Sequence, residues 1–325
     1  MRAIRQYQFG GPEVLVLDDV PDPEPAAGQV RVAVEASGVH FIDTTIRAGA
    51  QMGPYPLPDL PMTPGREIAG AVDGLGAGVD ETWLGRRVVG HLGQASGGYA
   101  ERAVIPVESV HELPDGVDVD AAIASVGTGR TAIITLDVAE IGSDDVVLVT
   151  AAAGGIGSLL VQAAGPHLGA TVIGLAGGPE KVALIRSLGV DSVDYLIDGW
   201  TTEVADLLDS RSPTVLVDGV GGAIGTAAAS LVAKGGRVVR IGYSSGSFGA
   251  DSDMFAAAGV EERWVVGPKA APLTVPVREF ETRALDATAN GVWAPFITEY
   301  ALADAARAHR DLVERRTTGK VVLRP

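Results

Sequence analysis

The residues with the clearest chemical use form a glycine-rich turn between a strand-like run and a helix-like run. Ala151-Ala152-Ala153-Gly154-Gly155-Ile156-Gly157 directly follows the apolar stretch Val146 to Thr150. Ala152, Gly154 and Gly157 give the spacing A-x-G-x-x-G, a dinucleotide-binding fingerprint with Ala at its first position. Gly154 would let the backbone approach a pyrophosphate, and Gly157 would let helix and strand pack closely. The turn favours a nucleotide coenzyme over a purely structural glycine turn.

The type of coenzyme depends on the end of the next strand. A site for NAD places Asp or Glu there, about 20 residues after the glycines, to bind the adenosine ribose. This chain has Leu175-Ala176-Gly177-Gly178 instead, followed by Lys181 at the start of a helix. Without a carboxylate to repel it, a 2′-phosphate can enter, and Lys181 is a cation to meet it. We therefore expect NADPH to be preferred over NADH; taken without the motif, Lys181 would be only a solvated helix residue.

The composition excludes several other classes of protein. The 325 residues include 25 Lys and Arg against 41 Asp and Glu, a formal net charge of −16, which disfavours nucleic acid and anionic membrane surfaces as partners. No cysteine is present, which excludes disulfides, thiolate zinc sites and a cysteine nucleophile. The first residues lack the apolar core of a signal peptide. A cytoplasmic location is expected.

One uncharged stretch has the length of a membrane span. No Asp, Glu, Lys or Arg occurs between Asp145 and Glu180, and a crossing helix needs about 20 apolar residues. Repeated glycines and Pro166 divide this stretch into two β-branched runs around an Ala/Leu-rich segment. We interpret it as strand, helix and strand of a parallel sheet, whose strands are apolar on both faces.

The remaining pattern predicts two domains. Short β-type segments in the first third suggest a small barrel: Leu15 to Val20, Gln29 to Ala36, Glu67 to Leu75, Arg86 to Leu92 and Tyr99 to Ile105. From about Asp120 strands alternate with helices, as in a doubly wound α/β domain. Its predicted strands are Val146 to Thr150, Thr171 to Leu175, Ser192 to Tyr195, Thr214 to Asp218 and Arg237 to Ile241, and its predicted helices are Ser158 to Leu168, Pro179 to Leu188, Thr201 to Leu208 and Ala223 to Val232.

The C-terminal part carries helical patterns near Val277 to Ala289 and Ala301 to Glu314 and a final strand, Lys320 to Leu323. This tail is too short to fold alone. We expect a catalytic domain of residues 1–122, a Rossmann NADP-binding domain of residues 123–266, and a segment of residues 267–325 that completes the first domain.

Many short matches in the same order give the chain a resemblance to a known family, the zinc-independent medium-chain dehydrogenases/reductases related to zeta-crystallin, the NADPH:quinone oxidoreductases. The matching segments are residues 36–43, 47–49, 64–70, 85–88, 98–101, 129–132, 151–157, 235–239, 242–246 and 318–323. The resemblance covers essentially the whole chain. It implies a GroES-like β-barrel catalytic domain beside a Rossmann domain, and commonly a homodimer.

The resemblance also implies roles for residues that bind the coenzyme. Thr131 resembles the residue that contacts the nicotinamide end, and Gly154, Gly155 and Ile156 fall where the pyrophosphate binds. Further positions fall near the 2′-phosphate (Lys181, Tyr195 and Arg315) or at backbone and apolar contacts to the coenzyme (Gly242, Tyr243, Val265 and Val266).

Zinc-dependent relatives need a Cys, a His and a further Cys or Asp around a catalytic metal, and here the corresponding positions hold His40 and Arg66, with Glu67 retained. Because Arg66 brings a fixed positive charge to a ligand position, we expect no metal. A site built from His40, Glu67 and Asp43 is the disfavoured alternative.

Two departures from the family pattern concern catalysis. His40 stands where the family usually has Asn, and Arg130 replaces an apolar residue beside Thr131. His40 could protonate a reduced substrate while Arg130 polarises its carbonyl. The alternatives are a His bonded to backbone and an Arg paired with Asp137 or Glu140.

Asp43, Arg47 and Tyr55 complete the catalytic candidates. In relatives the segment with Asp43 and Arg47 faces the nicotinamide, and Tyr55 in a Pro-rich loop would cover the acceptor; a structural Asp–Arg pair is the alternative for the first two. We expect NADPH-dependent hydride transfer to a small-molecule quinone or α,β-unsaturated carbonyl acceptor. The alternatives are an enoyl or alkenal reductase of specialised metabolism and a non-catalytic NADPH-binding structural or sensor protein.

Overall fold

The computed structural model describes residues 1–50, 56–93, 95–249 and 252–325, and these divide into two compact units. The first unit contains residues 1–129, 281–291 and 295–325, and the second contains residues 130–280 and 292–294. The first expected boundary, after residue 122, therefore lies seven residues before the division that the structure makes at Gly129. Most of the C-terminal segment belongs to the first unit.

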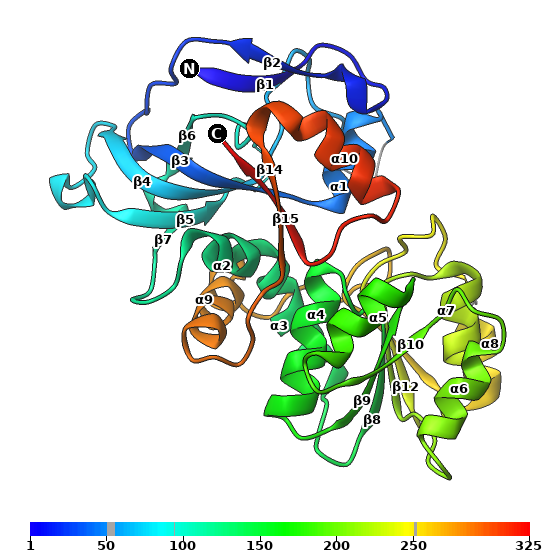
Figure 1. The fold of residues 1–325 in the computed structure, drawn as a ribbon. Helices are drawn as coiled ribbons and strands as arrows, with labels where there is room; N and C mark the ends of the chain where they lie inside the picture. The colour runs from blue at the N-terminus through cyan, green and yellow to red at the C-terminus, as the bar shows by residue number, and fades with distance from the viewer. Residues whose placement is uncertain (51–55, 94, 250–251) are drawn as a thin grey trace. The chain divides into compact units, whose positions relative to one another are not determined.

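The first unit is built on a mixed sheet, antiparallel except for the parallel pair β14 and β15, to which both ends of the chain contribute. Its strands are β1 (Arg2–Gln6), β2 (Leu15–Asp19), β3 (Gln29–Val39), β4 (Glu67–Leu75), β5 (Arg87–His91), β6 (Arg102–Pro106), β7 (Val110–Glu112), β14 (Ile297–Ala301) and β15 (Lys320–Arg324). The main sheet has the order β14-β15-β3-β4-β5-β7, with β6 also paired to β3, and β1 pairs with β2. Figure 1 shows the red C-terminal strand β15 beside the blue β3.

Four helices accompany this sheet: α1 (Phe41–Arg47), α2 (Val119–Ala124), α9 (Val277–Ala289) and α10 (Ala305–Val313). Valine and isoleucine side chains of β3, β4, β5 and β6 form one buried core under the sheet. The register of β15 against β3 pairs Val322 with Gly38, which brings the start of β15 close to the end of β3. The chain then turns at His40 into α1.

The second unit contains a parallel sheet with the order β10-β9-β8-β11-β12-β13. Its strands are β8 (Val146–Thr150), β9 (Thr171–Ala176), β10 (Asp191–Asp194), β11 (Val215–Asp218), β12 (Arg237–Arg240) and β13 (Glu261–Trp264). Its helices are α3 (Arg130–Ala139), α4 (Gly155–Gln162), α5 (Pro179–Arg186), α6 (Trp200–Leu207), α7 (Gly222–Ala229) and α8 (Ser252–Ala258). This strand order is that of the doubly wound Rossmann fold, as expected from the sequence.

The uncharged stretch after Asp145 forms β8, α4 and β9, so the interpretation as strand, helix and strand is confirmed. All five residues of β8 are buried, because a central parallel strand is covered on both faces. Within the part of the chain that the structure describes, no helix has both the length and the apolar surface needed to cross a bilayer.

Several boundaries differ from those expected from the sequence. The helix expected from Ser158 begins at Gly155 and gives way to a π-helical turn, Ala163–His167, which contains Pro166. Proline has no N–H to donate, so the regular hydrogen-bond pattern cannot continue through it. The edge strand β13 was not expected, because its sequence Glu-Glu-Arg-Trp lacks an apolar run.

Candidate functional site

The glycine turn of the second unit has the geometry that its spacing predicted. Ala151 has a φ of 50°, and the N–H of Gly154 bonds back to its carbonyl at 2.8 Å. A Cβ at position 157 would lie 2.3 Å from the Ala151 oxygen, so only glycine lets α4 approach β8 this closely. The first N–H groups of a helix have no partner within the helix. The turn can therefore present them to a diphosphate.

The end of β9 lacks a carboxylate, as the sequence indicated, but a neighbouring strand supplies one nearby. Gly177 packs against Tyr195, whose ring is 3.0 Å from the position a Cβ would take. Oδ1 of Asp194, the last residue of β10, accepts hydrogen bonds from the N–H groups of Gly178 and Leu196. Sequence reasoning missed Asp194 because it considered only the second strand, although parallel strands end at a common edge. Lys181 lies in the first turn of α5.

The other coenzyme candidates of this unit follow the ends of adjacent strands. Gly242 and Tyr243 come after β12, and the N–H groups of Val265 and Val266 bond to the carbonyl of Arg240. Arg130 and Thr131 begin α3, where the Thr131 carbonyl accepts from the Thr135 hydroxyl. Glu140, one of the two partners considered for Arg130, has its carboxylate 2.6 Å from the Arg263 guanidinium.

A fully buried polar cluster holds the loops at this edge of the sheet. Oδ1 of Asp218 accepts from the Thr150 hydroxyl at 2.8 Å and from the N–H groups of Val220 and Gly221. Oδ2 of Asp218 pairs with the Arg240 guanidinium at 3.0 Å. Sequence reasoning did not select these residues, although an Asp that ends an apolar strand was a usable signal.

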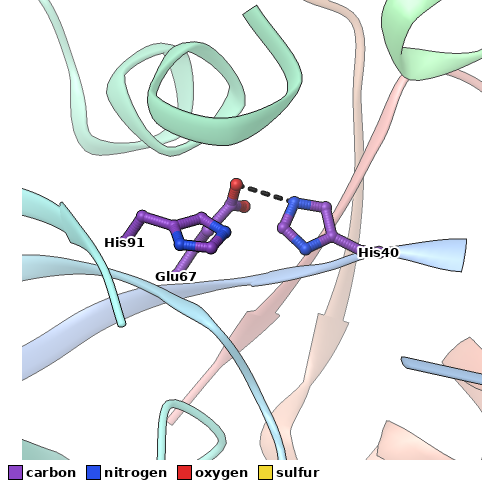
Figure 2. A group of neighbouring side chains, drawn as sticks. All are labelled: His40, Glu67 and His91. Carbon is purple, nitrogen blue, oxygen red and sulfur yellow. Dashed lines mark hydrogen bonds and ion pairs between the residues drawn. The ribbon is translucent and has the colours of Figure 1, made fainter. Parts of the chain in front are cut away.

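In the first unit, the His40 ring forms a hydrogen bond with a carboxylate that is wholly buried. His40 precedes α1, and its Nε2 lies 2.7 Å from Oε1 of Glu67, the first residue of β4 (Figure 2). The other oxygen of Glu67, Oε2, lies 2.6 Å from Nζ of Lys320, the first residue of β15. Burial favours the neutral acid, but His40 and Lys320 outweigh it and hold the pKa of Glu67 below its ordinary range. Glu67 is therefore an anion between two cationic or polar partners.

Two glycines form the slot that holds this carboxylate. A Cβ at position 127 would lie 1.7 Å from Oε1 of Glu67 and 3.1 Å from Nε2 of His40. A Cβ at position 38 would lie 2.1 Å from Oε2 of Glu67. Gly127 belongs to a π-helical turn, Ser125–Gly129, between α2 and α3. The backbone of two distant segments thus fixes where the carboxylate can lie.

A second histidine, which the sequence analysis did not select, lies beside this pair. His91 ends β5, its ring centroid is 5.9 Å from that of His40, and its Nδ1 accepts the N–H of Gly93. His40, Glu67 and His91 each offer one possible ligand atom, and these three atoms all lie within 4.8 Å of one another (Figure 2). A zinc ion does not fit this group as it stands, because both carboxylate oxygens are already engaged: Oε1 of Glu67 bonds Nε2 of His40 and Oε2 pairs with the Lys320 ammonium.

Asp43 and Arg47 are buried and belong to one chain of hydrogen bonds. Asp43 accepts from the backbone N–H of His40 at 2.9 Å and from the Tyr99 hydroxyl at 3.1 Å. Tyr99 also contacts Nε2 of His309, and Arg47 lies 3.4 Å from Nδ1 of the same ring. Arg47 can only donate, so His309 must accept at Nδ1 and donate from Nε2 to Tyr99. Asp43 and Arg47 are linked through two intermediates rather than paired directly.

The remaining candidates have separate surroundings. The Arg66 guanidinium lies 3.9 Å from Asp43. Asp43 does not belong to the group that His40, Glu67 and His91 form. The guanidinium of Arg315 stacks over the ring of Phe41 at 4.5 Å. Tyr55 lies outside the described residues.

Comparison with known proteins gives consistent matches along the chain. Residues 26–115 match the family model of the alcohol dehydrogenase GroES-like domain, and residues 155–267 match that of the zinc-binding dehydrogenases. A quinone oxidoreductase of Pseudomonas aeruginosa is 34% identical over 100% of this chain and 99% of its own.

Two solved structures resemble the chain over its whole length. The Escherichia coli quinone oxidoreductase complexed with NADPH has a TM-score of 0.86 and 30% identity, and a mycobacterial protein complexed with NADPH has a TM-score of 0.84 and 35% identity. In both comparisons 100% of each chain is covered.

Proposed function

The chain belongs to the zinc-independent quinone oxidoreductases of the medium-chain dehydrogenase/reductase superfamily, and from this we propose that it is an NADPH-dependent oxidoreductase that reduces a quinone or an α,β-unsaturated carbonyl compound. The observation that carries the proposal is the glycine turn between β8 and α4, where a side chain at position 157 would collide with the Ala151 carbonyl. The NADPH complexes of two similar structures support the same coenzyme.

The residues proposed to hold the coenzyme lie at the ends of the parallel strands. Gly155, Ile156 and Gly157 would bind the diphosphate with the N–H groups of the first turn of α4. Ala152 and Gly154, whose own N–H groups bond to the carbonyls of Leu175 and Ala151, would shape the turn around it. The residues proposed for the 2′-phosphate are Lys181, Tyr195 and Arg315, and those proposed for the nicotinamide half are Thr131, Gly242, Tyr243, Val265 and Val266. When bound, NADPH supplies a hydride from its nicotinamide ring.

We propose His40, Asp43, Arg47, Tyr55 and Arg130 as the catalytic candidates. The buried positions of Asp43 and Arg47 favour a supporting role, since neither side chain is more than 6% exposed. His40 is more accessible, with 20% of its side chain exposed. Metal chemistry is not part of the proposal, because the donors around His40 do not fit zinc.

The coenzyme preference is tested by a Lys181→Met variant. Hydrogen bonds to charged groups contribute about 1.5 to 3 kcal/mol, so we expect the KM for NADPH to rise roughly tenfold or more and the KM for NADH to change little. Steady-state kinetics with a simple quinone and both coenzymes measure this. An equal loss with both coenzymes, or a wild-type preference for NADH due to Asp194, would contradict the assignment.

The enzymatic proposal itself is tested by following NADPH oxidation with three acceptors: a simple quinone, a 2-alkenal and an enoyl thioester. Turnover of the quinone supports the proposal, whereas preference for the thioester would indicate an enoyl reductase. Tight NADPH binding, seen by fluorescence titration, without oxidation of any acceptor would indicate a coenzyme-binding structural or sensor protein.

The assembly and location of the protein complete the proposal. We propose a cytoplasmic homodimer that binds no nucleic acid, from the family resemblance and from the net charge of −16. Light scattering of the protein as it elutes from a size-exclusion column measures its molar mass, which tests the homodimer. Fluorescence anisotropy with labelled RNA at about 0.15 M salt tests nucleic-acid binding, and saturable binding there would contradict the expectation.

A further inference from the structure

The group around Glu67 has features of a proton-transfer device rather than of a simple structural ion pair. Its carboxylate is fully buried, the Lys320 side chain is 3% exposed, and the His40 side chain is 20% exposed. Protons can therefore leave or reach this group most directly at the imidazole.

The hydrogen bond between His40 and Glu67 fixes the tautomer of the ring. Because the Glu67 carboxylate is ionised, Nε2 of His40 must carry a hydrogen to bond it at 2.7 Å. The atom left to gain or lose a proton is Nδ1. A carboxylate that orients an imidazole in this way is a recurrent arrangement in acid–base catalysis. The backbone of His40 is held as well, through its N–H bond to Asp43.

Lys320 modifies what the carboxylate can do. Glu67 alone would stabilise a positive charge on His40, but the ammonium 2.6 Å from its second oxygen offsets part of that effect. A histidine that donates and recovers a proton in each cycle needs such a balance, since too strong an anion would retain the proton. Gly38 and Gly127 keep the carboxylate between the two partners.

Among the described residues, four further ionisable groups surround His40: His91, Asp43, Arg66 and Arg315. His91 on β5 lies with its ring centroid 5.9 Å away, and because its Nδ1 accepts the Gly93 N–H, the hydrogen of its neutral form is on Nε2. Asp43 on α1 contacts the His40 backbone, and Arg66 lies 3.9 Å from Asp43. Arg315 stacks on Phe41, the residue after His40.

We propose that Nδ1 of His40 donates the proton of the reaction, that Glu67 fixes the tautomer of its ring, and that Lys320 limits the stabilisation of its charge. The inference rests on the proposed function for the reaction it serves. The acceptor gains two electrons and one hydrogen as hydride from the reduced coenzyme. The second hydrogen comes from His40: its Nδ1–H bond breaks, an O–H bond forms at the acceptor oxygen, and solvent returns a proton to Nδ1. His40 is the catalytic residue, and Glu67 and Lys320 are positioning residues.

The first test measures the titration of the His40 ring directly in the coenzyme-free protein. The chain has five histidines, so ring carbon-13 labelling gives few NMR signals, and His40→Gln identifies the one that belongs to His40. We expect Glu67→Gln to move the midpoint to lower pH and Lys320→Met to move it to higher pH, each by roughly 0.5 to 2 units. The double variant should return towards the wild-type midpoint, and Lys320→Arg should retain it.

The second test follows the pH dependence of kcat with a quinone acceptor. Because the protonated ring donates, kcat should fall at high pH. The pH at which kcat falls should shift in each variant in the same direction as the NMR midpoint of His40. His40→Gln should lower kcat about 10²- to 10⁴-fold with little change in the KM for NADPH.

The outcomes separate the inference from the proposed function. If the variants only lower the melting temperature and leave the midpoint of His40 unchanged, the arrangement is structural and the inference is wrong. If the NMR midpoint of His40 shifts but the pH at which kcat falls does not, His40 is not the proton donor. If the wild-type protein oxidises no NADPH with any acceptor, the proposed function and the donor role fail together, whereas the balance between Glu67 and Lys320 is still decided by the NMR titration.

Discussion

At the scale of single residues, the first unit contains a buried histidine, His309, whose protonation is coupled to folding. His309 is completely buried and is held between Arg47 and Tyr99. Burial is the main cause that lowers its pKa to about 4; the charge of Arg47 lowers it further, and Asp43 opposes the shift. His309 is therefore neutral in the folded protein at neutral pH, in agreement with the donor order from Arg47 to Asp43.

This burial makes the stability of the protein depend on pH. The unfolded chain protonates His309 near its ordinary value of about 6.5, whereas the folded chain does so only near 4. The unfolded state thus binds more protons between these values, and stability is lost as the pH falls through about 6.5 and towards 4.

We expect His309→Gln to flatten this dependence. Between pH 7 and pH 5, this residue should lower the unfolding free energy of the wild-type protein by about 2 kcal/mol. The pH-dependent loss of the variant should be smaller by about 2 kcal/mol, whatever its stability at pH 7. Urea unfolding at both values measures it. His167→Gln, at an exposed position, is the matched control, and equal pH dependence in wild type and His309→Gln would contradict the assignment.

At the scale of elements, the distance between a strand and the following helix decides whether the coenzyme site can form. α4 begins five residues after β8 ends, and Gly157 in its first turn faces the Ala151 carbonyl. Ala152 and Gly174 are similarly close, since a Cβ at position 174 would lie 3.0 Å from the Cβ of Ala152. Small side chains at these positions are a packing requirement of this turn.

A Gly157→Ala variant tests this requirement. Its methyl group would lie 2.3 Å from the Ala151 oxygen, so α4 must move away from β8. Overpacking of this kind is destabilising by about 1 to 3 kcal/mol, and we expect NADPH affinity to fall as well. Gly142→Ala is the control, because no atom lies within 4 Å of its Cβ position and its φ is not positive; similar behaviour of the two variants would exclude the packing argument.

At the scale of the whole molecule, the chain order joins distant segments into the first unit. β15, at the C-terminal end of the described chain, lies between β14 and β3, pairs antiparallel with β3, and carries Lys320. The carboxylate of Glu67 therefore depends on a strand that follows the entire second unit in sequence. The second unit has its own sheet and its own buried core.

Truncation after Thr317 should destabilise the first unit and leave the stability of the second unit largely unchanged. It removes β15, leaves β3 and β14 without their shared partner, and removes the cation beside the buried Glu67. We expect the first unit to lose its cooperative unfolding transition while the second retains one, as measured by calorimetry. Two unchanged transitions would show that β15 is dispensable.

Much of the fold was predictable because it depends on residues that are close in sequence. The apolar runs predicted β8, β9, β11 and β12, the glycine spacing predicted the turn into α4, and α9 begins and ends at the predicted residues. Hydrophobic periodicity and turn residues act over a few positions, so they can be recognised in the chain itself. The edge strand β13 and the π-helical turns were missed because their sequences carry no such local pattern.

The sequence by itself determined the doubly wound domain, the glycine turn and the absence of thiolate chemistry. The tertiary structure alone revealed that Glu67 lies between His40 and Lys320, that His91 is beside them, and that His309 connects Arg47 to Tyr99. These residues come from strands and helices far apart in the chain. Their meeting depends on strand order and register, which long-range pairing sets and local sequence does not encode.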